Sequence, residues 1–126
     1  MQGAQYGSPV PARMGEGRLS DRMRIAAVAV VAALGVEGVV RGDDGGDGRY
    51  ATAVGEELLR GVVVAAQRGG RYSVDLYLIA ALVPLRPLGD RVREAVVRGV
   101  EAAGLDQWLG PVGVTFLSVE KSVGHP

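Results

Sequence analysis

The sequence predicts an α+β fold, in which two helices cover one face of a three-stranded sheet. Two observations carry this prediction. A helix-like apolar run over 20–36 is followed by two strand-like runs that flank a Gly-Gly pair. An amphipathic pattern over 88–103 then leads into a last alternating run. The element order α-β-β-α-β fits a two-layer sandwich around one core.

One domain is expected over 19–121, because 126 residues are enough to bury a core without disulfide or metal staples. Residues 1–18 contain repeated Gly and Pro and no apolar periodicity, so we expect a flexible N-terminal tail there. Residues 122–126 are expected to form a short C-terminal tail.

The first helix is expected to begin after Ser20, whose side chain can cap the first turn, and to end near Val36. It is apolar on every side, and a helix without a polar face is normally covered on more than one side. The sequence leaves open the alternative that alanine simply favours helix and tolerates water. One of the apolar stripes consists of Ala27, Val31 and Leu34.

The segment 42–48 contains three aspartates among glycines and is expected to be a solvated loop. A calcium-binding EF-hand that started at Asp43 would place Gly45 at the third position and Val54 at the twelfth, where a glutamate is required. This spacing excludes an EF-hand. The stretch 51–59 fits either a short helix or irregular structure, and the sequence does not decide between them.

The clearest local pattern is a β-hairpin with strands over 61–67 and 72–82. A two-residue turn at the intervening glycines needs a positive φ at both and pairs Arg68 with Arg71. This register sets Val63 opposite Leu76 on the face toward the helices. The other face is then more apolar than a solvated sheet face usually needs to be, which favours a covering partner. Its apolar side chains are Val62, Val64, Tyr77 and Ile79.

The second helix is expected over 88–103, after two prolines end the strand. Gly104 is a natural left-handed stop, and Leu105 is placed to fold back on the last turn. A third strand is expected over 112–117. A right-handed crossover from the second strand to the third leaves the first strand free to lie between them, which predicts the sheet order 2-1-3.

The sequence offers little for catalysis or cofactor binding. Cysteine is absent, and the one histidine, His125, lies beside the carboxyl terminus. The serines fit no nucleophile-elbow pattern, and no glycine loop with a Walker lysine leads from a strand into a helix. We therefore expect a non-enzymatic protein with no catalytic, cofactor-binding or metal-binding residue.

Charge and hydropathy restrict the partners. Fourteen basic and fourteen acidic residues cancel, so no overall field draws the chain to nucleic acid or to an anionic bilayer. The longest uncharged apolar run, 25–36, is shorter than the roughly 18 residues that span a membrane. A small KH-like RNA-binding module stays the alternative, although no GXXG loop lies between two predicted helices. The arginines available to it are Arg68, Arg71, Arg91, Arg93 and Arg98.

The chain's source and location are also indicated by composition. Lysine is nearly absent while Arg, Gly, Ala and Val are abundant, which suggests a GC-rich bacterial genome. A chain without cysteine is compatible with a reducing compartment, so a cytoplasmic location is expected.

Three segments of the chain occur in an order known from one bacterial family. They are 24–39, which includes Val36-Glu37-Gly38-Val39; the strand 72–78, which includes Val74-Asp75-Leu76-Tyr77; and 88–100 followed by the alternating run 112–119. These segments resemble the alkaline shock protein family, also called the envelope stress response or Gls family. The resemblance covers most of 19–121. The Gly-Pro tail, the Asp-Gly loop and the two prolines before the second helix depart from the family pattern.

The resemblance implies a cytosolic, non-enzymatic protein that self-associates and is held near the membrane by a partner protein, with a role in envelope stress. It implies no catalytic residue. The apolar surface of the first helix and of the outer sheet face also favours a homo-oligomer. The expected interface residues are Ala27, Val31, Leu34, Val62, Val64, Tyr77 and Ile79.

Overall fold

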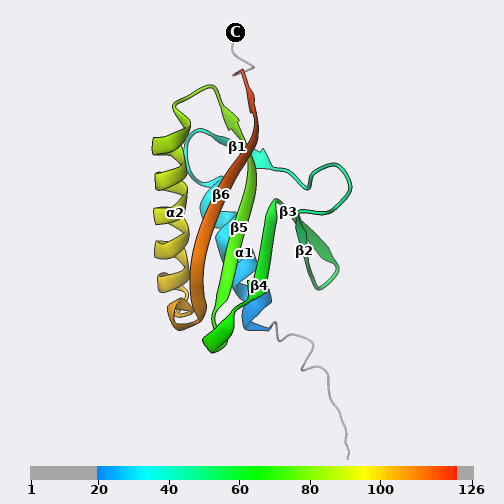
Figure 1. Cartoon of the computed structure of the whole chain (residues 1–126), viewed down its shortest axis with the longest axis vertical. Coiled ribbons are helices and arrows are strands. Elements are labelled where there is room, and N and C mark those ends of the chain that lie inside the picture. The colour runs from blue at the N-terminus through cyan, green and yellow to red at the C-terminus, as the bar shows by residue number, and fades with distance from the viewer. Residues whose placement is uncertain (1–19, 122–126) are drawn as a thin grey trace, which may run out of the picture.

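The chain folds into two helices packed against a mixed β-sheet, with a small separate hairpin at one side (Figure 1). The structure is a computed structural model, and it describes residues 20–121. The tails expected at 1–18 and 122–126 lie outside the described residues. The predicted α+β class is confirmed, although the number and order of the strands differ from the prediction.

Helix α1 (Asp21–Leu34) begins where the sequence predicts. The hydroxyl oxygen of Ser20 accepts a hydrogen bond from the Met23 N–H at 3.2 Å and so caps the first turn. The helix stops two residues earlier than expected, at Gly35, whose N–H donates to the Val31 carbonyl. Four side chains are buried beneath it: Ile25, Ala26, Ala29 and Ala33.

Three short strands that the sequence does not predict follow α1. Strand β1 (Val39–Gly42) pairs antiparallel with the end of the long central strand. Strands β2 (Ala51–Val54) and β3 (Glu57–Arg60) form a separate hairpin, so the undecided stretch 51–59 is β structure. The buried Thr52 hydroxyl donates to the Val62 carbonyl at 2.7 Å, and this bond attaches the hairpin to the main sheet.

The predicted hairpin is present as β4 (Val62–Ala66) and β5 (Tyr72–Ala81), but its predicted register is wrong by one residue. Both glycines of the turn have the expected positive φ of 82°. However, Arg68 belongs to a three-residue 3-10 turn (Arg68–Gly70), and the Gln67 N–H donates to the Arg71 carbonyl at 2.8 Å. A shift of one residue exchanges the two faces of a strand.

The corrected register moves two expected interface residues into the core. Val62 lies opposite Leu76, and Val64 lies opposite Val74. Their side chains are 0% and 2% exposed, respectively. The prediction that Val62 and Val64 lie on the outer face is therefore wrong.

Helix α2 (Leu85–Ala102) starts earlier than predicted, because a proline in the first turn lacks only an N–H that the helix does not use. Its expected end is confirmed. Gly104 adopts a φ of 74°, and the Leu105 N–H donates back to the Val100 carbonyl at 3.0 Å. The Leu105 side chain is buried.

The sheet order also differs from the prediction. Strand β6 (Leu109–Glu120), which follows a short 3-10 turn (Asp106–Trp108), pairs in parallel with β5, not with β4. Strands β4 and β1 share the other edge of β5, so β5 is central and the predicted order 2-1-3 is wrong. Length explains this result, because β5 is long enough to pair with most of β6, whereas β4 has only five residues.

One hydrophobic core lies between the helices and the inner face of the sheet. Helix α2 approaches α1 closely at Gly99, where a Cβ would lie 3.3 Å from a Val28 methyl and 3.4 Å from the Ala32 Cβ. Helices α1 and α2 are therefore in close packing contact at this point. The largest fully buried side chains include Ile25, Leu76, Leu78, Leu88, Val92 and Val96.

Candidate functional site

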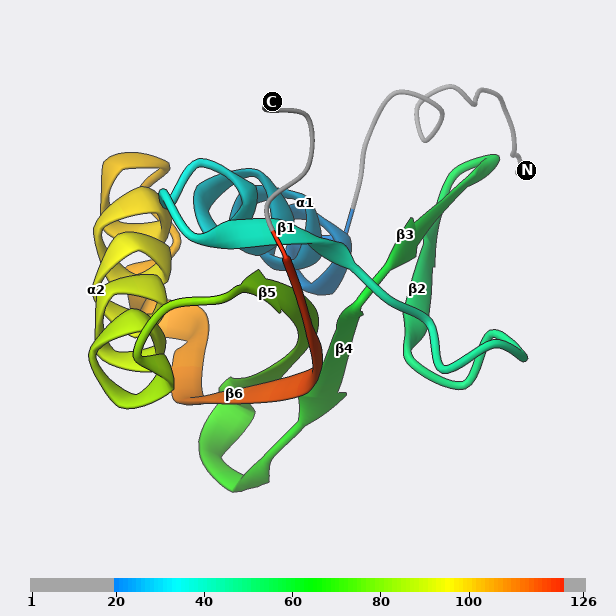
Figure 2. The ribbon, with the colours of Figure 1, turned by 90° about the horizontal axis from the view of Figure 1, so that it is seen from above.

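The most exposed apolar surface of α1 is the row of Ala27, Val31 and Leu34, called here the α1 stripe. Val31 is 73% exposed and Leu34 is 46% exposed, whereas Ala27 is half-buried. Figure 2 shows why this row stays uncovered: α1 lies between α2 on one side and the β2–β3 hairpin on the other. The sheet occupies the third side. Within residues 20–121, nothing packs on the fourth.

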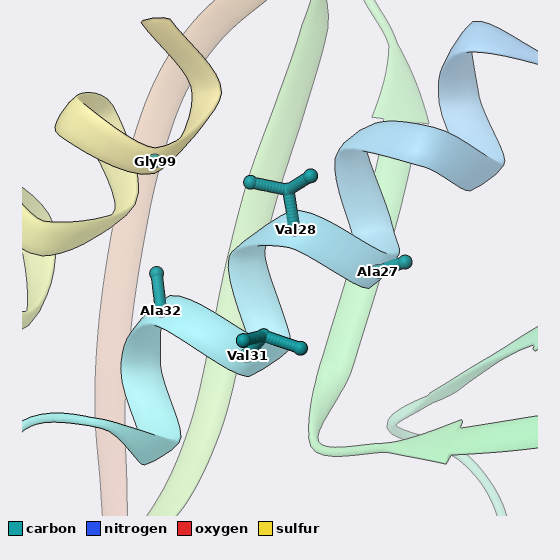
Figure 3. Close-up of a pocket in the computed structure, with 5 residues that line it drawn as sticks. All are labelled: Ala27, Val28, Val31, Ala32 and Gly99. Carbon is teal, nitrogen blue, oxygen red and sulfur yellow. The ribbon is translucent and has the colours of Figure 1, made fainter. Parts of the chain in front are cut away.

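A shallow apolar groove runs beside the α1 stripe (Figure 3). Its volume is about 390 Å³, it is open to solvent, and its walls expose no polar atom. Small-molecule sites are usually more enclosed and contain a few polar groups that orient the ligand. This groove therefore suits an apolar side chain of another protein better than a substrate. Its lining residues are Ala27, Val28, Val31, Ala32 and Gly99.

The sequence identifies only part of this groove. Helical periodicity predicts that Ala27 and Val31 belong to an interface, but it does not single out Val28, Ala32 or Gly99. A glycine inside an otherwise regular helix is a usable signal, because it often marks a close approach of another element. Gly99 serves this role here, and the approach of α1 at that point creates the groove.

The outer face of the sheet is not open at Tyr77, contrary to expectation. The Tyr50 ring stacks on the Tyr77 ring, with centroids 3.8 Å apart and planes inclined by 8°. The loop that carries Tyr50 is held by the Asp43 N–H, which donates to the Tyr77 carbonyl at 3.0 Å. Burial, and then the negative charge of Asp75, raise the pKa of the Tyr77 hydroxyl. Tyr77 is thus part of a contact within the chain.

Ile79 is also covered, with only 4% of its side chain exposed. It pairs with Arg41 of β1 on one side and with Ser118 of β6 on the other. Arg41 and Glu120 join these two flanking strands by a two-pronged ion pair with N–O distances of 2.6 and 3.0 Å. This hydrogen-bonded pair raises the pKa of Arg41 and lowers that of Glu120. The expected sheet half of the interface is therefore not an exposed apolar surface.

The aspartates of the 42–48 loop hold the loop itself. The Asp44 carboxylate accepts hydrogen bonds from the Gly46 N–H at 2.8 Å and from the Arg60 guanidinium at 3.0 Å, and both lower its pKa. Asp47 accepts from the Arg49 N–H and from its guanidinium, which lowers its pKa likewise. Among residues 20–121, no three acidic or histidine side chains gather closely enough to hold a metal ion. His125 lies outside this range.

Two of the five arginines considered for RNA binding contact the chain itself. The Arg71 guanidinium donates to the Leu109 carbonyl at 2.8 Å and so fixes the start of β6. Arg93 forms an ion pair with Asp90 on α2. These contacts reduce the number of basic side chains that are available to phosphates, and they do not favour the RNA-binding alternative.

Comparisons with known proteins add no assignment. No protein-family model, no curated protein and no solved structure matches this chain. No helix in the part of the chain that the structure describes is long and apolar enough to cross a membrane.

Proposed function

We propose that this chain is a non-enzymatic, self-associating bacterial protein that acts as a scaffold or adaptor near the cell envelope. Its sequence resembles the alkaline shock protein family, and that resemblance supports a cytoplasmic location near the membrane through a membrane-anchored protein partner. The observation that carries the proposal is the α1 stripe. Val31 and Leu34 are exposed beside a groove without polar walls.

The physical argument concerns apolar area. Fully burying a valine or leucine side chain contributes about 1.5–3 kcal/mol relative to leaving it in water. Because Val31 is 73% exposed, most of this stabilisation is gained only when another surface buries its side chain. A second protein surface on α1 would remove Val31 and Leu34 from water together and fill the adjacent groove. An enzyme would instead need convergent polar groups, which this groove lacks.

The decisive experiment is size-exclusion chromatography with light scattering on the full chain and on Val31→Asp. The parent is expected to have a mass well above the 13.1 kDa of one chain. Val31→Asp is expected to stay folded and to become monomeric, because a carboxylate in an apolar interface must be desolvated.

Leu82→Asp is the matched control, because Leu82 is 71% exposed and lies outside both helices. This variant should keep the mass of the parent. A monomeric parent, or an unchanged mass in Val31→Asp, would overturn the proposal. Absorbance at 260 nm is recorded in the same run, since a monomer that carries nucleic acid would point to the RNA-binding alternative.

A further inference from the structure

Four charged residues form one row along the outer side of α2. Arg91, Glu94, Arg98 and Glu101 follow each other at helical spacings of three, four and three residues, and all four are exposed. Residues at these spacings lie on one side of a helix. Among residues 20–121, none of the four takes part in an ion pair, whereas Arg93 pairs with Asp90 on the neighbouring side.

The order of charges along this row is complementary to itself when the row is reversed. The signs run plus, minus, plus, minus from Arg91 to Glu101. If α2 packs antiparallel to α2 of a second copy, Arg91 faces Glu101 of that copy, and Glu94 faces its Arg98. Every facing pair then has opposite signs. A parallel arrangement in register would instead place like charges together.

The charged row and the α1 stripe belong to adjacent helices. Figure 3 shows Gly99 of α2 beside Val28 and Ala32 of α1, with Val31 at the near edge of the groove. Successive residues of a helix project about 100° apart, so Arg98, which precedes Gly99, lies on the side of α2 next to the one that borders the groove. An apolar centre beside a polar, charged margin is the usual composition of a protein interface.

The edges of the sheet are less suited to joining two copies. On β6, Pro111 lacks an N–H and Leu117 is the extra residue of a bulge, and both features hinder pairing with another strand. On β4, the carbonyls of Val62 and Val64 already accept hydrogen bonds from Thr52 and Arg22. Blunted edges of this kind protect against strand addition.

We propose that this two-helix face is a two-fold interface between two copies of this chain, in which the α2 helices run antiparallel. The inference rests on the proposed self-association and specifies its geometry. Two-fold contacts use the same surface on both subunits, as a self-complementary row requires. The apolar stripe supplies most of the affinity, whereas the charged row fixes the orientation and excludes other registers.

The test uses single charge reversals at the central pair, Glu94→Arg and Arg98→Glu, in the full chain. In either variant alone, like charges meet at two symmetric positions of the dimer. Each variant is therefore expected to self-associate at least about tenfold more weakly than the parent. Sedimentation equilibrium measures the dissociation constants, and circular dichroism checks that both variants are folded.

An equimolar mixture of the two variants is expected to recover association, because one chain then carries two positive charges where the other carries two negative ones. Native mass spectrometry identifies the mixed dimer. Charge effects within a single helix cannot produce this rescue. Arg86→Glu is the control: it reverses an exposed arginine of α2 outside the row and should leave association unchanged.

The outcomes separate this inference from the proposed function. If the parent associates but the single reversals do not weaken it, or if the mixture fails to recover, the antiparallel α2 interface is wrong while self-association stands. If the parent is a monomer throughout, both proposals are overturned.

Discussion

Stacking between Tyr50 and Tyr77 attaches the 43–50 loop to the central strand. Such aromatic pairs contribute about 0.5–1.5 kcal/mol beyond the burial of their area. We expect a double-mutant cycle of Tyr50→Ala and Tyr77→Ala, measured by urea unfolding, to give a coupling energy in that range. Purely additive effects would contradict a direct contact between the rings. Because Tyr77 lies in this contact, Tyr77→Asp should lower stability and not merely change the oligomer size.

Asp44 should make the closure of the same 43–50 loop depend on pH in the acid range. The hydrogen bond from the Gly46 N–H, and then that from Arg60, hold the pKa of Asp44 below its ordinary value of 3.8. A carboxylate whose pKa is depressed by folding stabilises the fold fully above the unfolded pKa, and this contribution is lost as the pH falls through the folded pKa. The loop should therefore loosen below about pH 4 and stay closed above about pH 5.

NMR titration of the Asp44 carboxyl, together with amide exchange over 43–50, measures this effect. In Asp44→Asn the side chain cannot ionise, so the loop amides should lose the part of their pH dependence that Asp44 causes. Asp47 has a lowered pKa through its own contacts with Arg49, and its titration serves as an internal reference. An Asp44 carboxyl that titrates at or above its ordinary pKa would contradict the predicted direction.

At the scale of elements, two glycines bring the start of β4 close to the end of β1. They are Gly61, directly before β4, and Gly42, the last residue of β1. Gly61 has a φ of 86°, and a Cβ there would lie 2.6 Å from the Tyr77 carbonyl oxygen and 2.7 Å from the Gly42 Cα. These neighbours are backbone atoms that cannot move alone. A left-handed conformation by itself costs an L-residue about 1–2 kcal/mol. Gly61→Ala should therefore cost clearly more than that in urea unfolding.

Gly104→Ala is the matched control for this prediction. Gly104 also has a positive φ, of 74°, but nothing lies within 4 Å of the position of an added Cβ. Its replacement should cost only the conformational part, about 1–2 kcal/mol. Equal costs at the two glycines would mean that the backbone crossing at Gly61 relaxes freely.

The elements also show what local sequence can predict. The start of α1 at Ser20 and the end of α2 at Gly104 follow from capping chemistry within a few residues, and both are confirmed. The hairpin register depends on whether Arg68 pairs with Arg71 or belongs to the turn. Because Arg68 belongs to the turn, every side chain of β4 lies on the face opposite to the predicted one. The position of β6 beside β5 depends on contacts far apart in the sequence.

The candidate site shows the same difference between what local sequence predicts and what depends on distant contacts. Helical periodicity is a local property, so the α1 stripe was predictable and Val31 and Leu34 are exposed as expected. In the sheet half, Val62 and Val64 are buried, because the face on which they lie follows the register. Tyr77 is half-buried under Tyr50, which comes from a loop 27 positions earlier whose path no local pattern indicates.

At the scale of the whole molecule, the two faces of the sheet are covered by different elements. On the outer side, the Tyr50 ring and the Arg41–Glu120 ion pair cover the apolar positions of β5. On the inner side, the helices complete one core but leave Val31 and Leu34 exposed. Large apolar side chains also stay exposed outside the helices, at Val40, Leu58, Leu82, Leu117 and Val119, but Val31 is the most exposed of those in residues 20–121 and lines an apolar groove. This combination of exposure and groove is the reason to expect association through α1.

Association through that face should stabilise the fold by mass action. Binding of the native state alone raises stability with concentration, by about 2.7 kcal/mol when the partner is at 100 times its dissociation constant. The thermal midpoint of the parent should therefore rise by several degrees when the protein is concentrated about 100-fold across its dissociation constant. Val31→Asp should show a midpoint that does not depend on concentration, whereas Leu82→Asp should behave like the parent. Calorimetry or circular dichroism at matched scan rates measures this difference. A concentration-independent midpoint in an associating parent would mean that association does not require the native helical face.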